Sequence, residues 1–120
     1  MNGIPDNYDF GFFVGKMLIQ ICIGQYETIL HFTEGISIEM YDCFHHIRDN
    51  IDMSSDVVLP MRSSSLLDLL GSSVVNVEVK RNQKDRIVLY FSNKDTLCIT
   101  DKYDNYESFV VTNKIGSLPI

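Results

Sequence analysis

The fold is decided by two stretches of the sequence, GKMLIQICI at residues 15–23 and GSSVVNVEV at residues 71–79. In both stretches a glycine is followed by apolar residues at every second position, and the two glycines lie 56 residues apart. The matching apolar positions are Ile19, Ile21, Ile23, Val75, Val77 and Val79. An apolar alternation of period two is typical of a β-strand with one buried face. The two stretches therefore predict equivalent strands in two copies of one unit.

The similarity continues through the next two strands of each copy. Residues 30–32 (LHF) match residues 89–91 (LYF) at an offset of 59, and residues 36–38 (ISI) match residues 97–99 (LCI) at an offset of 61. The offset grows at two turn sequences, residues 80–85 and 93–96, where insertions are tolerated. The predicted strands cover residues 17–23, 27–33 and 35–41 in the first copy and residues 73–80, 86–92 and 95–101 in the second.

The two repeat units, residues 15–41 and 71–112, belong to a single domain over residues 1–120, with residues 42–70 as the connector. Three serines before the leucine-rich run and Gly71 after it predict a short helix over residues 64–70. We expect residues 42–62 to be irregular, with room for one helical turn, residues 106–112 to form a closing strand, and the tail after Asn113 to fray. The predicted fold is mainly β: two pseudo-repeated antiparallel meanders packed as a sandwich or partly open barrel.

One face of the predicted strands is apolar and the opposite face is semi-polar with a few aromatic residues. The semi-polar face is the best candidate for binding, because aromatic rings could stack on a flat ligand and polar groups could hydrogen-bond it. Arginines in the connecting segments could hold a phosphate. Tyr106, in the closing strand, could help to set the edge of the sheet. The candidate binding residues are Gln20, His31, Glu39, Tyr41, Arg48, Arg86, Tyr90 and Tyr106.

The second copy carries a pattern that resembles a known set of proteins. The pattern consists of Leu70-Gly71 before a valine-rich strand, then Leu89-Tyr90-Phe91, then Leu97-Cys98-Ile99, and finally Tyr106-Glu107-Ser108-Phe109. It resembles a family of small bacterial β-proteins described mainly as a domain of unknown function, some of whose relatives look like immunity proteins of toxin systems. The resemblance covers about residues 12–112. It implies a β-fold and a binding role in bacterial conflict.

The charge and the cysteines limit the class of partner and the compartment. The formal net charge is −6 and the pI is about 4.8, so the chain repels phosphate backbones and duplex nucleic acid is not an expected partner. The same charge suits a basic protein. Three widely spaced cysteines indicate reduced thiols and therefore a cytosolic protein. With the resemblance, this implies the cytosol of a bacterial host. The apolar run Met17–Ile23 is too short to span a bilayer.

Catalytic and metal-binding motifs are weak in this sequence. Cys43, His45 and His46 lie close together, but a closed zinc site needs four ligands, and the distant His31 and Cys22 would have to complete it. We favour a loop cysteine and two surface histidines. No nucleophile motif surrounds a cysteine, and no glycine-rich phosphate loop is present. We therefore expect no metal, no cofactor and no enzymatic activity.

Two functions remain open at this point. The first is an immunity-protein-like inhibitor that neutralises a toxin or effector protein. The second is a phage anti-defence protein that sequesters a nucleotide-derived signalling molecule in a pocket formed by several copies. We also expect a homo-oligomer, because an exposed edge strand can pair with another copy of the chain.

Overall fold

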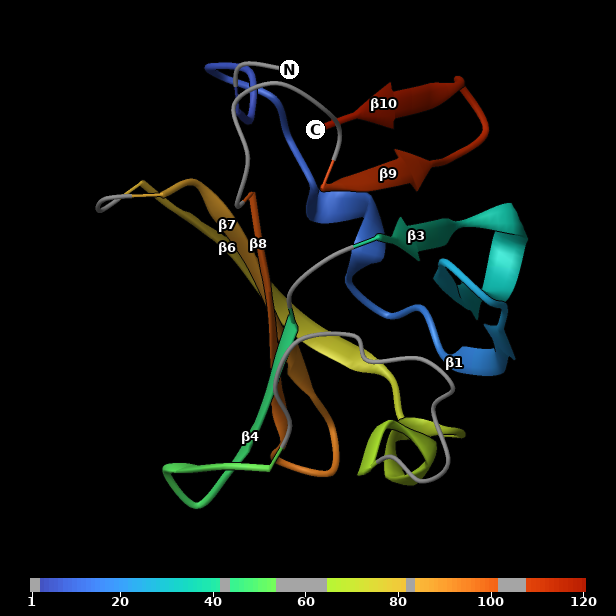
Figure 1. The fold of residues 1–120 in the computed structure, drawn as a ribbon, viewed down its shortest axis with the longest axis vertical. Coiled ribbons are helices and arrows are strands. Elements are labelled where there is room, and N and C mark those ends of the chain that lie inside the picture. The colour runs from blue at the N-terminus through green and yellow to red at the C-terminus, as the bar shows by residue number, and fades with distance from the viewer. Residues whose placement is uncertain (1–2, 42–43, 54–64, 82–83, 102–107) are drawn as a thin grey trace.

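The computed structural model describes residues 3–41, 44–53, 65–81, 84–101 and 108–120, and these residues form two five-stranded antiparallel sheets (Figure 1). Sheet one has the order β1-β2-β3-β9-β10, and sheet two has the order β5-β4-β8-β7-β6. The strands of sheet one are β1 (Leu18–Ile23), β2 (Thr28–Phe32), β3 (Ser37–Met40), β9 (Phe109–Thr112) and β10 (Ser117–Pro119). Those of sheet two are β4 (Phe44–Arg48), β5 (Ile51–Asp52), β6 (Val74–Lys80), β7 (Arg86–Phe91) and β8 (Thr96–Thr100). The chain is thus mainly β, with two antiparallel sheets arranged as in a sandwich.

Six strands follow the predicted repeat, and both repeats are three-stranded meanders. Each meander is then extended by a hairpin from the other half of the chain. The hairpin β4–β5 follows β3 in sequence but pairs with β8, whereas β9–β10 follows β8 and pairs with β3. The two halves therefore exchange hairpins, which ties residues far apart in sequence into both sheets.

Reciprocal backbone contacts show that the two halves are related by an approximate two-fold axis. The Gly15 amide donates to the Val74 carbonyl at 2.8 Å, and the Gly71 amide donates to the Leu18 carbonyl at 2.9 Å. Gly71 lies 56 positions after Gly15, and Val74 lies 56 positions after Leu18, so the two hydrogen bonds are equivalent. An isolated bridge joins Met17 to Ser73, which are also 56 residues apart. The axis therefore passes close to this bridge.

Single 3-10 turns take the place of the predicted helix. The described turns are η1 (Gly11–Phe13), η2 (Thr33–Gly35) and η3 (Ser65–Leu69). The predicted helix over residues 64–70 corresponds to η3, whose Leu66 and Leu69 are buried. Two of the four leucines thus pack inward, whereas Leu67 and Leu70 are exposed, and the turn is tighter and shorter than an α-helix.

The predicted burial of the first strand was wrong at the equivalent positions Ile19 and Val75 of the two copies, and in the first copy also at Ile23, which is 46% exposed. Ile19 and Val75 were expected inside, but their side chains are 55% and 56% exposed. The pairing register shifts beside each of them, between residues 18 and 20 and between residues 74 and 76. A β-bulge adds a residue and changes which face the following side chains occupy. Leu18 and Val74 are consequently the buried residues at the start of these strands.

Three other expectations need correction. The segment 42–62 was expected to be irregular, but it contains β4 and β5. The tail does not fray after Asn113, because β10 pairs with β9 and Ile120 is buried. The third strands are related by an offset of 59 rather than 61, since Leu30 pairs with Ile38 and Leu89 pairs with Leu97. The closing strand begins at Phe109, and Tyr106 lies outside the described residues.

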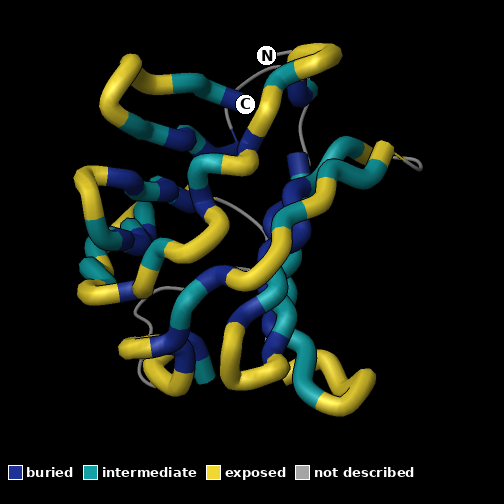
Figure 2. The backbone as a smooth tube through the Cα atoms, turned by 180° about the vertical axis from the view of Figure 1, so that it is seen from behind, coloured by how far each residue is buried: buried dark blue, intermediate teal, exposed yellow. Residues whose placement is uncertain are grey.

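The core lies where the two sheets meet, and buried residues alternate with more exposed ones along the strands (Figure 2). Phe32 of sheet one and Phe91 of sheet two stack with ring centroids 6.4 Å apart. The N-terminal segment adds Phe10 and Phe13 to the same cluster. In the part of the chain that the structure describes, no helix is long and apolar enough to cross a membrane.

Candidate functional site

A polar network with His46 and Asp95 buried at its centre connects η3, β4 and the turn between β7 and β8. The His46 imidazole has no exposed surface, and its Nε2 lies 2.7 Å from Asp95 Oδ2 while its Nδ1 lies 2.7 Å from Ser65 Oγ. Arg48 donates to both carboxylate oxygens of Asp95, from Nε at 2.8 Å and from Nη2 at 2.7 Å. Its Nη2 also donates to Asp68 at 3.2 Å. The network thus joins three segments that meet only in the folded chain.

The charges in this network stabilise one another. The Arg48 hydrogen bonds, assisted by His46, lower the pKa of Asp95 to about 2, against the opposing effect of burial. In return, the hydrogen bonds from Asp95 and Asp68 raise the pKa of Arg48 above its already high ordinary value. The Asp95 carboxylate therefore remains ionised inside the protein at neutral pH.

A serine, a histidine and an aspartate in one chain of hydrogen bonds invite comparison with a hydrolase triad. In this network, however, both imidazole nitrogens bond to protein groups, and the Asp95 carboxylate is shared with Arg48 and Asn93. The imidazole is fully buried, so it offers no exposed nitrogen to a substrate. We interpret the network as a structural clamp that holds η3 and β4 against the β7–β8 turn.

Only a weak signal for this network is present in the sequence. Phe44, His46 and Arg48 alternate along β4, which is the spacing of residues on one face of a strand. Because His46 and Arg48 are polar, the alternation does not look like a buried strand. Their partner Asp95 lies 49 residues from His46 in sequence, and no local motif connects them.

Exposed apolar residues lie in and beside the two segments that pair at the two-fold axis, residues 14–19 and 70–75. The residues come in pairs related by the axis: Ile19 with Val75 at the two bulges, and Val14 with Leu70, which are 44% and 43% exposed. Met17 lies between them at the Met17–Ser73 bridge. Gly15 and Gly71 border these residues, and nothing lies within 4 Å of where their Cβ atoms would be. We call Val14, Met17, Ile19, Leu70 and Val75 the axis strip.

Most residues predicted for ligand binding lie on the outer faces of the two sheets, and the structure divides them. Gln20, His31 and Glu39 belong to β1, β2 and β3 of sheet one, and Tyr41 follows β3 and donates to the Glu39 carboxylate. Arg86 and Tyr90 belong to β7 of sheet two. The outer faces of two packed sheets point away from each other, so one chain does not bring these residues into a single site.

Tyr90 has a defined local environment on sheet two. Its hydroxyl donates to the Glu78 carboxylate on the neighbouring strand β6. This hydrogen bond, with burial adding to it, raises the pKa of Tyr90 to about 12. Nearby on β8, burial raises the pKa of the Cys98 thiol. Neither group is activated for nucleophilic chemistry, because both shifts favour the protonated form.

The remaining predicted residues are placed separately. Arg48 belongs to the polar network rather than to a ligand site. In the predicted cluster of Cys43, His45 and His46, His45 Nδ1 lies 2.7 Å from Asp52 Oδ2, and His46 belongs to the network. Cys43 and Tyr106 are outside the described residues. The described residues contain no group of three or more His, Cys, Asp and Glu side chains that could hold a metal ion.

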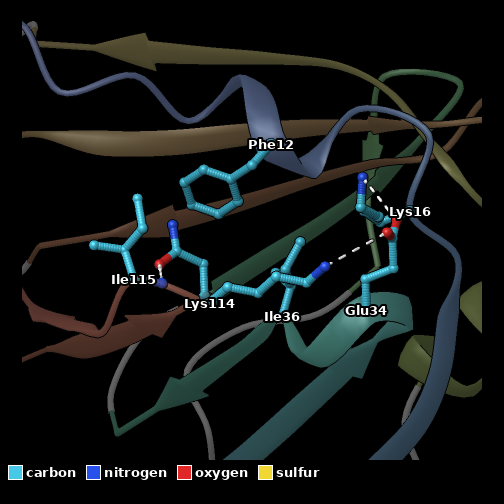
Figure 3. A pocket seen from close by; sticks show the side chains of 7 residues that line it. Phe12, Lys16, Glu34, Ile36, Lys114 and Ile115 are labelled. Carbon is cyan, nitrogen blue, oxygen red and sulfur yellow. Dashed lines mark hydrogen bonds and ion pairs between the residues drawn. The ribbon is translucent and has the colours of Figure 1, made fainter.

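An open pocket lies where the β9–β10 turn meets η1 and η2 (Figure 3). It has a volume of about 350 Å³, with apolar walls from Phe12, Ile36 and Ile115. The Glu34 carboxylate lies between two ammonium groups, 3.2 Å from Lys16 Nζ and 4.0 Å from Lys114 Nζ. The sequence did not predict this pocket, because its residues come from opposite ends of the chain.

Comparisons with known proteins do not assign the chain to a family. No protein-family model, no curated protein and no solved structure matches it. The resemblance to small bacterial β-proteins therefore stays a prediction from the sequence, and the function has to be argued from the surfaces and sites described above.

Proposed function

We propose that this chain is a non-catalytic binding protein that neutralises a protein partner, as immunity proteins of bacterial toxin systems do. The observation that carries this proposal is the axis strip. Five apolar side chains there are each exposed by two fifths or more, and the bulges at Ile19 and Val75 turn two of them outward. A gathered set of exposed apolar residues commonly marks a surface for another protein.

The charge of the chain supports the choice of a basic partner. A net charge of −6 accelerates encounter with a positively charged surface and slows encounter with a negatively charged one. In this proposal the charge selects and steers the partner, and burial of the axis strip supplies most of the affinity. The complex should therefore weaken as salt is added, but an apolar contribution should remain at high salt.

A second copy of the chain is a competing occupant of the same surface. A two-fold related strip is suited to self-association, because both sides of an isologous interface are the same. Two of the four edge strands are less suited to pairing, since β5 has two residues and β10 ends in Pro119. The other two, β1 and β6, are longer and begin at the axis strip. Homo-oligomerisation through the axis strip thus remains part of the proposal, and sedimentation velocity of the purified chain measures it.

The test is co-expression of the chain with the products of its neighbouring genes. We expect one product to be toxic and basic, to form a salt-sensitive one-to-one complex with this chain, and to lose its toxicity in its presence. The Ile19→Ser/Val75→Ser variant should no longer protect, whereas Ile51→Ser should, because Ile51 is exposed on the distant β4–β5 hairpin. Absence of protection by the wild-type chain against every neighbouring product would refute the proposal.

The nucleotide-sequestering alternative draws no support from the outer faces of a single chain. Its predicted residues are divided between two sheets, so they could form one pocket only if a second copy contributed the missing part. Equilibrium dialysis with cyclic nucleotides, at concentrations where the oligomeric state is known, tests that alternative directly.

A further inference from the structure

The pocket and the polar network occupy equivalent places in the two halves of the molecule. The exchanged hairpins are related by an offset of 65: Ile47 pairs with Asp52 in one, and Thr112 pairs with Ser117 in the other. Residues before the first strand of each half are related by an offset of 56, and the turns β2–β3 and β7–β8 by an offset of 59. Together, the three offsets match four residues of the pocket to four of the network. Phe12 corresponds to Asp68, Glu34 to Asn93, Ile36 to Asp95, and Asn113 to Arg48.

The two halves fill this common place in different ways. In the network half, the Arg48 side chain crosses from its hairpin to Asp95 and Asp68 and occupies the space between them. In the other half the shorter Asn113 replaces the arginine, and the apolar Ile36 replaces the aspartate that an arginine would need. The result is an open pocket of about 350 Å³ at the place where, in the other half, the Arg48 side chain lies.

The charges at the pocket favour an anion. Lys16 and Lys114 contribute two ammonium groups, and Glu34 contributes one carboxylate that holds them on the same side (Figure 3). The pocket therefore carries an excess positive charge on a chain whose net charge is −6. Two lysines that approach one carboxylate can also approach a second anionic group, because each ammonium has three donors.

The apolar walls favour a flat group beside the anion. Phe12 presents its ring to the pocket opposite Ile115 (Figure 3), and the Ile115 side chain is 96% exposed at the tip of the β9–β10 turn. A ring placed between them would remove apolar surface from water. The volume is near the lower end of the range for small-molecule pockets, roughly 300–1,000 Å³, which suits one ring rather than a dinucleotide.

We propose that this pocket binds a small organic anion that carries one flat apolar group. The phosphate or carboxylate lies near Lys16 and Lys114, and the flat group packs between Phe12 and Ile115. The proposal goes beyond protein binding and does not rest on it, since the pocket shares no residue with the axis strip. It also uses none of the residues that the sequence suggested for ligand binding.

The experiment is a titration of the ¹³C-methyl-labelled chain with phenyl phosphate and with AMP, followed by NMR. Inorganic phosphate and benzyl alcohol serve as probes of charge alone and of the ring alone. We expect saturable shifts of the Ile36 and Ile115 methyl signals with at least one of the two combined probes, and binding about tenfold weaker or more with each control probe. The Ile19 methyl signal, on the axis strip, should not move.

Two variants test the two parts of the pocket, and each has a matched control in the other half of the molecule. Lys114→Gln and Ile115→Asp should each weaken binding by about fivefold to tenfold, because one removes an ammonium and the other adds a repelling carboxylate. Lys94→Gln, in the β7–β8 turn, and Ile51→Asp, on the β4–β5 hairpin, should leave the affinity unchanged. All four positions are exposed, so we expect each variant to fold, and the dispersion of its methyl spectrum checks this. Absence of saturable shifts, or equal effects of test and control variants, would overturn the proposal.

Discussion

Gly15 and Gly71 adopt the same left-handed backbone conformation, with φ angles of +85° and +84°, at equivalent positions of the two halves. Each donates its amide to the first strand of the opposite half, so the same local geometry is used twice to join the sheets. Glycine is suited to these positions because a side chain is strained at positive φ. The two residues thus connect the repeat seen in the sequence to the two-fold axis seen in the structure.

Replacing either glycine with alanine tests this connection. Nothing lies within 4 Å of the place that the new methyl group would take at either site, so the cost should come from the backbone alone and should be similar at both. We expect Gly15→Ala and Gly71→Ala each to lower the free energy of unfolding by about 1–2 kcal/mol. Urea denaturation measures this change. Clearly unequal effects of the two variants would contradict the two-fold relation of these positions.

The reverse substitution, to glycine, can be made at Lys94, which belongs to another pair of equivalent positions. Its φ is +74°, and its counterpart 59 residues earlier is Gly35, whose φ is +73°. Lys94→Gly should raise the free energy of unfolding, or leave it unchanged within about 1 kcal/mol, because the relief of backbone strain is offset by greater freedom of the unfolded chain. Destabilisation by several kcal/mol in urea denaturation would show that the lysine side chain itself stabilises the fold.

The polar network predicts a specific loss of stability in acid. The pKa of Asp95 in the folded chain is about 2, below the ordinary value of 3.8. The contribution of its carboxylate to the free energy of unfolding is therefore complete above about pH 4 and is lost as the pH falls through about 2. A shift of this size corresponds to about 2 kcal/mol. In urea denaturation between pH 2 and pH 6, Asp95→Asn should be less stable than the wild type at pH 6, with the difference shrinking toward pH 2.

The control for the acid experiment is Asp49→Asn. Asp49 is exposed in the β4–β5 turn at a φ of +53°, a conformation that asparagine also tolerates. This variant should follow the acid dependence of the wild type throughout the range. An Asp95→Asn variant that also followed the wild type would mean that the buried carboxylate does not stabilise the fold through its charge.

The same network makes a prediction about catalysis. If Ser65, His46 and Asp95 form a structural clamp, a fluorophosphonate probe should not label Ser65, because an activated nucleophile needs a base that can exchange protons with the reaction site. Mass spectrometry after incubation with the probe measures labelling. Stoichiometric modification of Ser65 that disappears in the His46→Gln variant would show catalytic competence and would contradict a purely structural role.

Tyr90 should ionise at unusually high pH. Its hydrogen bond to Glu78 places the pKa at about 12, compared with 10.0 for an ordinary tyrosine. The difference between ultraviolet titrations of the wild type and of Tyr90→Phe isolates this group from the other five tyrosines. In Glu78→Gln the negative charge is absent, so the pKa of Tyr90 should move back toward 10. An unchanged titration in that variant would rule out Glu78 as the cause.

The sequence predicted what depends on local alternation and missed what depends on exchange between the halves. Strands with apolar residues at every second position were located correctly, and the repeat in residues 15–23 and 71–79 indicated two meanders. The bulges at Ile19 and Val75 were not predicted, since a bulge leaves the sequence pattern intact while changing which face is buried. Strand β4 was missed because the buried His46 interrupts the apolar pattern.

The candidate sites were harder to predict than the strands. The pocket combines Phe12 and Lys16 with Lys114 and Ile115, and the pairing of β9 with β3 helps to bring these distant segments together. The axis strip depends on two outward-facing bulge residues that looked like core residues in the sequence. Outer-face residues such as His31 and Tyr90 share a parity, but they lie on different sheets. Alternation defines the face of a strand without defining the sheet it joins.

The most direct test of the proposed function is the affinity of the axis-strip variant for the neutralised partner, measured by isothermal titration calorimetry. If the strip forms the centre of the interface, Ile19→Ser/Val75→Ser should weaken the Kd by about 100-fold or more, since truncated apolar anchors at interface centres typically cost about 2 kcal/mol each. The Ile51→Ser control should retain the wild-type Kd. A double variant that binds and neutralises the partner as well as the wild type would contradict the proposal that the axis strip is the binding surface.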